Sequence, residues 1–178
     1  MKIALCGKMA SGKTTIAEHL RHIIGHKGGF RIVSMAGEVK RVGRELFGME
    51  EKDRPLLQQI GMKMREIRES VWLDALIQES NKQELYGYSV VCDDVRFINE
   101  AKTLKEHGWV LIKLDINDDL QKERLQKTYP DDWAVHWNNR SDASEAEVDK
   151  IPLELFDLVI PSANDDSVIN SVWEFLFT

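Results

Sequence analysis

The sequence predicts an α/β fold in which a five-stranded parallel sheet is covered by helices on both faces. Short, almost continuously apolar runs alternate with longer amphipathic segments along the 178 residues, as expected of buried parallel strands joined by crossover helices. Several amphipathic segments end at a glycine, which commonly closes a helix. The expected strands are residues 2–6, 30–35, 88–92, 109–114 and a stretch within 155–160.

The helices follow from the spacing of apolar residues and from their end signals. The longest expected helix, 55–80, carries apolar residues every three or four positions, and Pro55 suits its first turn. Asn117 is a suitable cap for the helix that follows it, and residues 128–140 are expected to be irregular. The other expected helices are 14–24, 38–47, 97–107, 118–127 and 167–177.

Two segments interrupt the strict alternation of strand and helix. Both leave the carboxyl end of a strand, the side on which such sheets bind ligands. We therefore expect one domain, 1–178, with a core and two additions. The core is residues 1–35, 86–116 and 146–178, the helical acceptor-binding insertion is 36–85, and the lid is 117–145.

Composition excludes several classes of function. With 24 Lys and Arg against 30 Asp and Glu, the net charge of −6 disfavours nucleic acid as a partner. No apolar run reaches the ~18 residues that a membrane span needs, and the N-terminal apolar run is too short for a signal peptide. Cys6 and Cys92 lie in apolar runs, which favours buried, reduced thiols. We expect a cytoplasmic protein.

The first strand is followed by GKMASGKT at residues 7–14, which fits G-x-x-x-x-G-K-[ST]. Glycines let successive N–H groups turn inward around phosphate oxygens, and the next helix adds its positive end. A lysine at this place reaches the β- and γ-phosphates, and the hydroxyl after it binds Mg²⁺. A three-layer P-loop NTPase fold is therefore expected. The expected ATP-binding residues comprise eight residues of the loop region and two arginines further along the chain: Gly7, Lys8, Ala10, Ser11, Gly12, Lys13, Thr14, Thr15, Arg124 and Arg140.

A P-loop leaves three classes of protein open: a small-molecule kinase, a nucleotide-driven switch or motor, and a simple NTP-binding module. The length disfavours a motor, and the N-K-x-D motif of a GTPase is missing from the sequence. A kinase needs an acceptor site and a cover that excludes water, and the two added segments can supply both. The sequence favours a kinase.

The third strand ends in VVCDDVR at residues 90–96. An acid at the end of such a strand reaches Mg²⁺ through water, and we prefer Asp94 to Asp93 for that role beside Thr14. Arg96 can fork onto a phosphate, the alternative being a surface ion pair with Glu100.

The insertion and the lid supply further candidates. Gln58 could read a base edge, while Trp72 is either a core residue or a stacking platform. Arg124 and Arg140 flank the lid and could neutralise charge on a transferring phosphoryl group. The aromatic residues of the lid, Tyr129, Trp133 and Trp137, either pack it closed or form an anchoring patch, and the aromatic content also suggests a homodimer.

Four stretches stand out in order along the chain: GKMASGKT (7–14), LLQQIGMKMRE with VW after it (within 56–72), DVRFINEA (94–101) before GWVLIKL, and Ser144-Glu145 before FDLVI. Together they resemble the bacteriophage-type deoxynucleoside monophosphate kinases, members of the wider nucleoside monophosphate kinase fold. The resemblance implies transfer of the γ-phosphoryl group of ATP to a deoxynucleoside monophosphate, with Mg²⁺. It also implies the host cytoplasm as the location if the protein is phage-encoded. One departure is Asp142, where that family often has histidine.

The resemblance also implies roles. Arg65 and Arg96 would hold the acceptor phosphate, and Arg124 would close over the phosphates. The catalytic set would be Lys13, Asp94, Arg96 and Arg124, with Thr14 and Asp94 on the metal. The acceptor set would be Lys40, Gln58, Arg65, Trp72, Arg96 and Glu100. Two alternatives stay open: a kinase of another phosphorylated metabolite, such as phosphomevalonate or dephospho-coenzyme A, and a non-enzymatic NTP-binding module.

Overall fold

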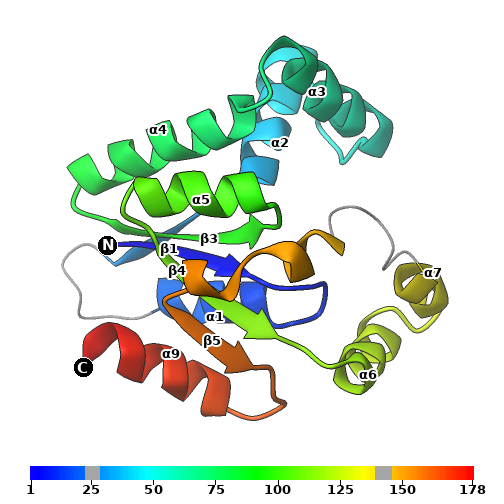
Figure 1. Cartoon of the computed structure of the whole chain (residues 1–178). Coiled ribbons are helices and arrows are strands. Elements are labelled where there is room, and N and C mark those ends of the chain that lie inside the picture. The colour runs from blue at the N-terminus through cyan, green and yellow to red at the C-terminus, as the bar shows by residue number, and fades with distance from the viewer. Residues whose placement is uncertain (23–28, 139–145) are drawn as a thin grey trace.

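The computed structural model describes residues 1–22, 29–138 and 146–178. Its centre is a parallel sheet of five strands in the order β2-β3-β1-β4-β5 (Figure 1). This confirms the predicted fold class. The strands are β1 (Lys2–Cys6), β2 (Phe30–Val33), β3 (Ser89–Val95), β4 (Val110–Asp115) and β5 (Leu158–Pro161).

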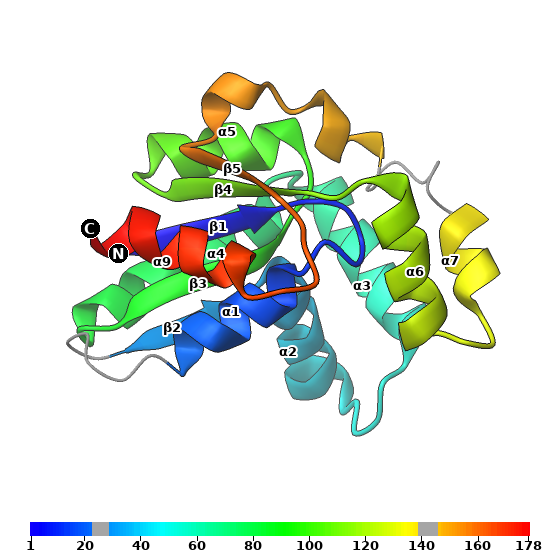
Figure 2. The ribbon, with the colours of Figure 1, turned by 90° about the horizontal axis from the view of Figure 1, so that it is seen from below.

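Helices cover both faces of the sheet. Figures 1 and 2 show α4 and α5 on one face and α1 and α9 on the other. The helices are α1 (Lys13–Arg21), α2 (Met35–Phe47), α3 (Arg54–Ile67), α4 (Val71–Leu85), α5 (Ile98–Glu106), α6 (Asp118–Thr128), α7 (Trp133–Asn138) and α9 (Ser167–Phe177). Two 3₁₀ turns, η2 (Val148–Lys150) and η3 (Leu153–Leu155), precede β5.

The central strand β1 directs its alternate side chains into two apolar cores, one on each face of the sheet. Ala4 and Cys6 join the core under α4 and α5, while Ile3 and Leu5 join the core under α1 and α9. Both cysteines are free and buried, as predicted. Burial raises the pKa of Cys6 to about 11, so the thiol stays protonated and unreactive at neutral pH.

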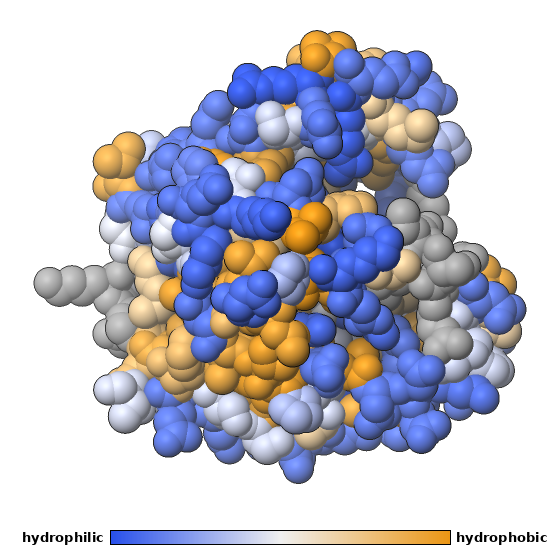
Figure 3. Space-filling model, viewed as in Figure 1, coloured by the Kyte–Doolittle hydropathy of each residue, from blue (hydrophilic) through white to orange (hydrophobic). Residues whose placement is uncertain are grey.

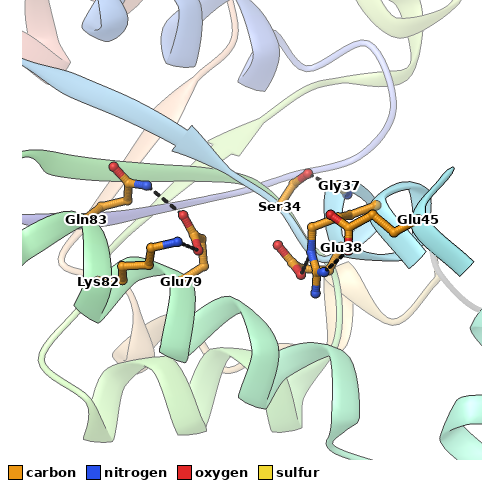
Figure 4. A network of polar contacts seen from close by, with 8 residues as sticks. Ser34, Gly37, Glu38, Glu45, Glu79, Lys82 and Gln83 are labelled. Carbon is orange, nitrogen blue, oxygen red and sulfur yellow. Dashed lines mark hydrogen bonds and ion pairs between the residues drawn. The ribbon is translucent and has the colours of Figure 1, made fainter. Parts of the chain in front are cut away.

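Ser34 begins α2 three residues earlier than predicted. Its hydroxyl accepts the N–H of Gly37 at 2.8 Å, a standard N-cap, and Arg41 bridges Glu38 and Glu45 along the same helix (Figure 4). The N-cap sets the point at which α2, the first helix of the insertion, leaves the sheet.

The prediction of one long helix at 55–80 is wrong, because α3 ends at Ile67 and α4 begins at Val71. Arg68 is extended, and Ile67, one of the regularly spaced apolar residues of the expected helix, is 82% exposed. The break lets α4 turn back so that the buried Trp72 Nε1 donates to the Gly61 carbonyl at 3.1 Å. Ser70, the N-cap residue of α4, donates its hydroxyl proton to Asp74 Oδ2 at 2.8 Å in the first turn of that helix.

The lid also differs from the prediction, since the segment expected to be irregular contains α7. The Lys122 ammonium lies 5.5 Å from the Trp133 ring centre and 5.9 Å from that of Trp137, which fastens α7 to α6 by cation–π contacts. Tyr129 and His136 pack with ring centres 4.3 Å apart. The aromatic residues therefore hold the lid hairpin together.

Exposed apolar side chains occur beside the edge strand β5. Leu153 and Val159 are 60% and 42% exposed, and hydrophobic surface is visible in this region (Figure 3). The homodimer stays a prediction. Along the described part of the chain, none of the helices has the length and apolar character required to cross a bilayer.

Candidate functional site

Residues 7–14 form the predicted loop after β1, with Lys13 and Thr14 in the first turn of α1. Gly7 and Gly12 have φ angles of +154° and +102°, and Ala10 at the crest of the loop has φ +63°. Glycine adopts such angles at little cost, whereas alanine is strained there. These angles fold the main chain into the concave turn that the motif predicts.

Gly7 has no space for a side chain. An added Cβ would lie 2.6 Å from both the Leu114 carbonyl oxygen and the Ser11 hydroxyl. We expect Gly7→Ala to lower the free energy of unfolding by about 2–4 kcal/mol, measured by urea denaturation. The control is Gly61→Ala, where a helical Cβ meets no atom within 4 Å, and there we expect a gain of about 0.5–1 kcal/mol. A wild-type midpoint for Gly7→Ala would contradict the crowding argument.

Lys13 is buried, and its ammonium lies over the loop. Nζ donates to the carbonyl oxygens of Gly7 and Lys8, each at 2.7 Å. The next residue, Thr14, donates its hydroxyl proton to Asp93 Oδ2 at 2.7 Å. A point charge and a hydroxyl–carboxylate pair therefore stand at the mouth of the loop.

The structure brings Asp93 to Thr14, not the preferred Asp94. Because Ala4 pairs with Cys92 but Cys6 with Val95, strand β3 carries one extra residue here. Such a bulge re-aims neighbouring side chains. Asp94 instead accepts the N–H groups of Met35 and Ala36 at 3.3 and 2.9 Å, and burial raises its pKa. It thereby ties the end of β3 to the start of α2.

Arg124 joins the lid to the loop. Its guanidinium donates to the carbonyl of Ala10 at 2.8 Å, to Asn164 Oδ1 at 3.1 Å and to the Ala163 carbonyl. Partial burial lowers its pKa. In this arrangement Arg124 forms a wall of the site, with its N–H groups committed to protein oxygens.

A cavity of about 550 Å³ lies between the loop, α6 and the start of α9. Of the predicted ATP-binding residues, 10–15 and Arg124 line it. Lys8 does not, since its ammonium pairs with Asp149 at 2.8 Å. The lining residues that the motif did not indicate include Lys127, Thr128 and Asn164. Arg140, Asp142, Ser144 and Glu145 lie outside the described residues.

A second cavity of about 630 Å³ lies between α2, α3 and the end of β3. Its lining includes all six predicted acceptor residues: Lys40, Gln58, Arg65, Trp72, Arg96 and Glu100. Apolar walls come from Leu57, Met62 and Phe97 among others. A further cavity of about 570 Å³ adjoins it beside Asn99 and Thr103. Trp72, 3% exposed, is a core residue that also borders the cavity.

Glu100 is a buried carboxylate at the wall of this second cavity. It accepts the main-chain N–H groups of Arg96 and Phe97 at 2.9 and 3.1 Å, so its contact with Arg96 is no simple surface ion pair. Burial raises its pKa, and the two N–H bonds offset part of that rise.

The raised pKa of Glu100 makes its contribution to stability depend on pH. A carboxyl whose pKa is higher in the folded state stabilises the fold below its unfolded pKa, and this contribution is lost as pH rises through the folded pKa. Glu100→Gln does not titrate. We therefore expect the stability of the wild type relative to Glu100→Gln to be greater at pH 4 than at pH 7, measured by urea unfolding of both proteins. The same difference at both pH values would contradict the shift.

Comparison with known proteins gives a fold and no closer relationship. Neither a family model nor a curated protein matches the chain. Similar solved structures include shikimate kinase from Acinetobacter baumannii in complex with shikimate (TM-score 0.55, 16% identity, covering 98% of this chain and 92% of that one). A sugar kinase from Janibacter sp. has a TM-score of 0.60 and 16% identity, covering 98% of this chain and 93% of that one. Shikimate kinase from Aquifex aeolicus has a TM-score of 0.55 and 18% identity, covering 99% of this chain and 96% of that one.

At these identities the likeness shows the P-loop kinase fold alone. It supports the predicted fold and does not support membership of the bacteriophage-type deoxynucleoside monophosphate kinases. Within the described ranges, no three His, Cys, Asp or Glu side chains gather into a group that could hold a metal ion. Mg²⁺ in phosphate-binding sites takes one or two protein ligands and completes its coordination with phosphate oxygens and water. The pair of Thr14 and Asp93 fits a metal bound in that way.

Proposed function

We propose that this protein transfers the γ-phosphoryl group of ATP to the phosphate of a deoxynucleoside monophosphate. The observation that carries the proposal is the pair of cavities at the carboxyl end of the sheet. One is lined by the phosphate loop, and the other by Lys40, Arg65 and Arg96. At the β3 bulge, Asp93 contacts Thr14 of the first cavity and Asp94 lines the second. Two polyanions could therefore meet end to end across one strand end.

The first cavity would hold ATP. Inward-turned N–H groups and Lys13 would bind its phosphates, and the flat guanidinium of Arg124, held from its edges, would offer a face to the base. Thr14 and, through water, Asp93 would hold Mg²⁺. When bound, Mg²⁺ would neutralise charge on the β- and γ-phosphates.

The second cavity would hold the acceptor. Arg96 and Arg65 would hold its phosphate, and Lys40 adds positive charge to the same wall. Gln58 presents an amide that can pair with a base edge, and Leu57 and Met62 offer apolar surface to a planar ring. The acceptor phosphate is already an anion at neutral pH, so the protein would contribute alignment and charge neutralisation.

A second candidate is transfer to a hydroxyl group of a small metabolite. The observation in its favour is Asp94, a carboxylate of raised pKa that lines the acceptor cavity and could accept a proton from a hydroxyl. Shikimate and sugar kinases share the fold. The arginines on the same wall favour a phosphorylated acceptor instead, which also keeps phosphomevalonate as an alternative.

A coupled assay of ADP release over a panel of acceptors tests these candidates. The panel contains the four deoxynucleoside monophosphates, their ribose forms, shikimate, hexoses, dephospho-coenzyme A and phosphomevalonate. We expect at least one deoxynucleotide to give kcat/KM about a hundredfold above any non-nucleotide acceptor. Turnover of non-nucleotides alone would support the second candidate or another phosphorylated metabolite. ATP binding without transfer to any acceptor would indicate a binding module.

A further inference from the structure

We propose that Gln121 is a positioning residue for ATP binding, which holds the crest of the phosphate loop in shape from the lid helix α6. The inference rests on the proposed binding of ATP to this loop and is independent of the acceptor. No motif marks Gln121, and its side chain does not line the nucleotide cavity. Its action would pass through the main chain of the loop.

The crest needs support. Ala10 has φ +63°, a left-handed conformation that is costly for a residue with a Cβ and persists only when its surroundings enforce it. The Ser11 N–H donates to the Lys8 carbonyl at 3.2 Å, and the N–H groups after it, from Gly12 onward, are those that the motif turns toward phosphate. Relaxation at the crest would therefore misplace the donors next to it.

Helix α6 holds the crest at two consecutive carbonyl groups. Gln121 Nε2 donates to the Met9 carbonyl at 3.0 Å, and Arg124 Nη1 donates to the Ala10 carbonyl at 2.8 Å. The two side chains are three residues apart and so share one face of the helix. Both ribbon views show the loop after β1, in blue, extending toward the start of α6 (Figures 1 and 2). Ala10 is thus held at both adjoining peptide groups, through the Met9 carbonyl before its Cα and through its own carbonyl after it.

The burial of Gln121 separates this role from packing. The residue is 1% exposed, and within the described part of the chain its Oε1 is buried without a hydrogen-bond partner. A buried polar atom without a partner destabilises the fold, so an apolar side chain of the same length would serve packing better. The retained amide is explained by its other end, the donor to Met9.

Arg124 cannot replace this contact. Its guanidinium lines the nucleotide cavity, and in the proposed function it also faces the base. Gln121 is about one helical turn nearer the start of α6, does not line the cavity, and donates its amide to the Met9 carbonyl. It would keep the loop in shape whether or not Arg124 engages a nucleotide.

The test compares Gln121→Met with Gln126→Met, an exposed glutamine on the same helix. Binding of MgATP, of magnesium tripolyphosphate and of adenosine is measured by calorimetry, with the melting temperature of each variant. For Gln121→Met we expect a melting temperature close to that of the wild type, because removal of the unpaired Oε1 offsets loss of the donor to Met9. We also expect about tenfold weaker binding of both polyphosphates and unchanged adenosine binding. Gln126→Met should match the wild type in every measurement.

Wild-type affinity of Gln121→Met for tripolyphosphate would overturn the proposal, and so would a loss confined to adenosine. If the variant is less stable, amide hydrogen exchange far below its melting temperature decides: faster exchange confined to residues 9–12 supports the role, and unchanged exchange there overturns it. Failure of the wild type itself to bind MgATP would instead refute the proposed function. The two failures are therefore distinguishable.

Discussion

Lys13→Ala is expected to lower kcat for phosphoryl transfer by about a thousandfold or more, to the limit of detection. The ammonium is buried at the centre of the loop, within 2.7 Å of two of its carbonyl oxygens. A cation held there faces phosphate charge in surroundings with little screening, where it is worth more than in water. The measurement is coupled ADP release with saturating acceptor.

The matched control is Lys8→Ala, because Lys8 belongs to the same loop and carries the same charge. Its ammonium turns away and pairs with Asp149 at the surface. Exposed pairs contribute little, so activity should change by about twofold or less. Lys13→Met keeps most of the side-chain length and separates loss of charge from loss of packing. Near-normal turnover in both Lys13 variants, with intact folding, would refute the role of the loop.

The contrast between these two lysines shows what could be predicted from sequence. The loop and Lys13 follow from local chemistry, since the glycines, the strand before them and the helix after them are adjacent in the chain. The direction of the Lys8 side chain depends on Asp149, which tertiary folding brings beside it. The motif could not indicate that contact.

The two aspartates at the end of β3 give the same lesson for the sheet. The pattern of an apolar strand that ends in acidic residues correctly predicted that both aspartates lie at the end of β3. Which of them reaches Thr14 depends on the bulge opposite Cys6, a property of how β3 pairs with β1. Periodicity within one strand carries no information about that register.

In the helical insertion the predicted acceptor residues lie together, whereas the backbone that carries them differs from the prediction. The six predicted acceptor residues line one cavity although the helix expected to carry three of them is broken. The apolar spacing runs through Arg68 without interruption, so it hid the break. The turn back toward Gly61, where Trp72 finds its partner, is a tertiary contact that the pattern did not show.

Arg96→Ala is expected to raise the acceptor KM by about a hundredfold and to lower kcat by about tenfold, while the affinity for ATP stays unchanged. Arg96 follows the β3 bulge and lines the acceptor cavity, while Asp93 at the same bulge contacts Thr14. A guanidinium that holds the acceptor phosphate also sets its distance from the donor, so both constants should respond. Steady-state kinetics with each substrate varied in turn and calorimetric ATP titration measure these quantities.

Two further variants determine whether geometry or charge is responsible. Arg96→Lys keeps the charge and loses the planar fork, so it should recover part of the KM and little of the kcat. Arg41→Ala removes an exposed cation of α2 that pairs with Glu38 and Glu45, and it should leave both constants within about twofold. Unchanged acceptor kinetics in Arg96→Ala would remove Arg96 from the site. A loss of ATP affinity in the same variant would instead assign Arg96 to the ATP site. A residue that binds only the acceptor should change the acceptor kinetics and leave the calorimetric ATP titration unchanged.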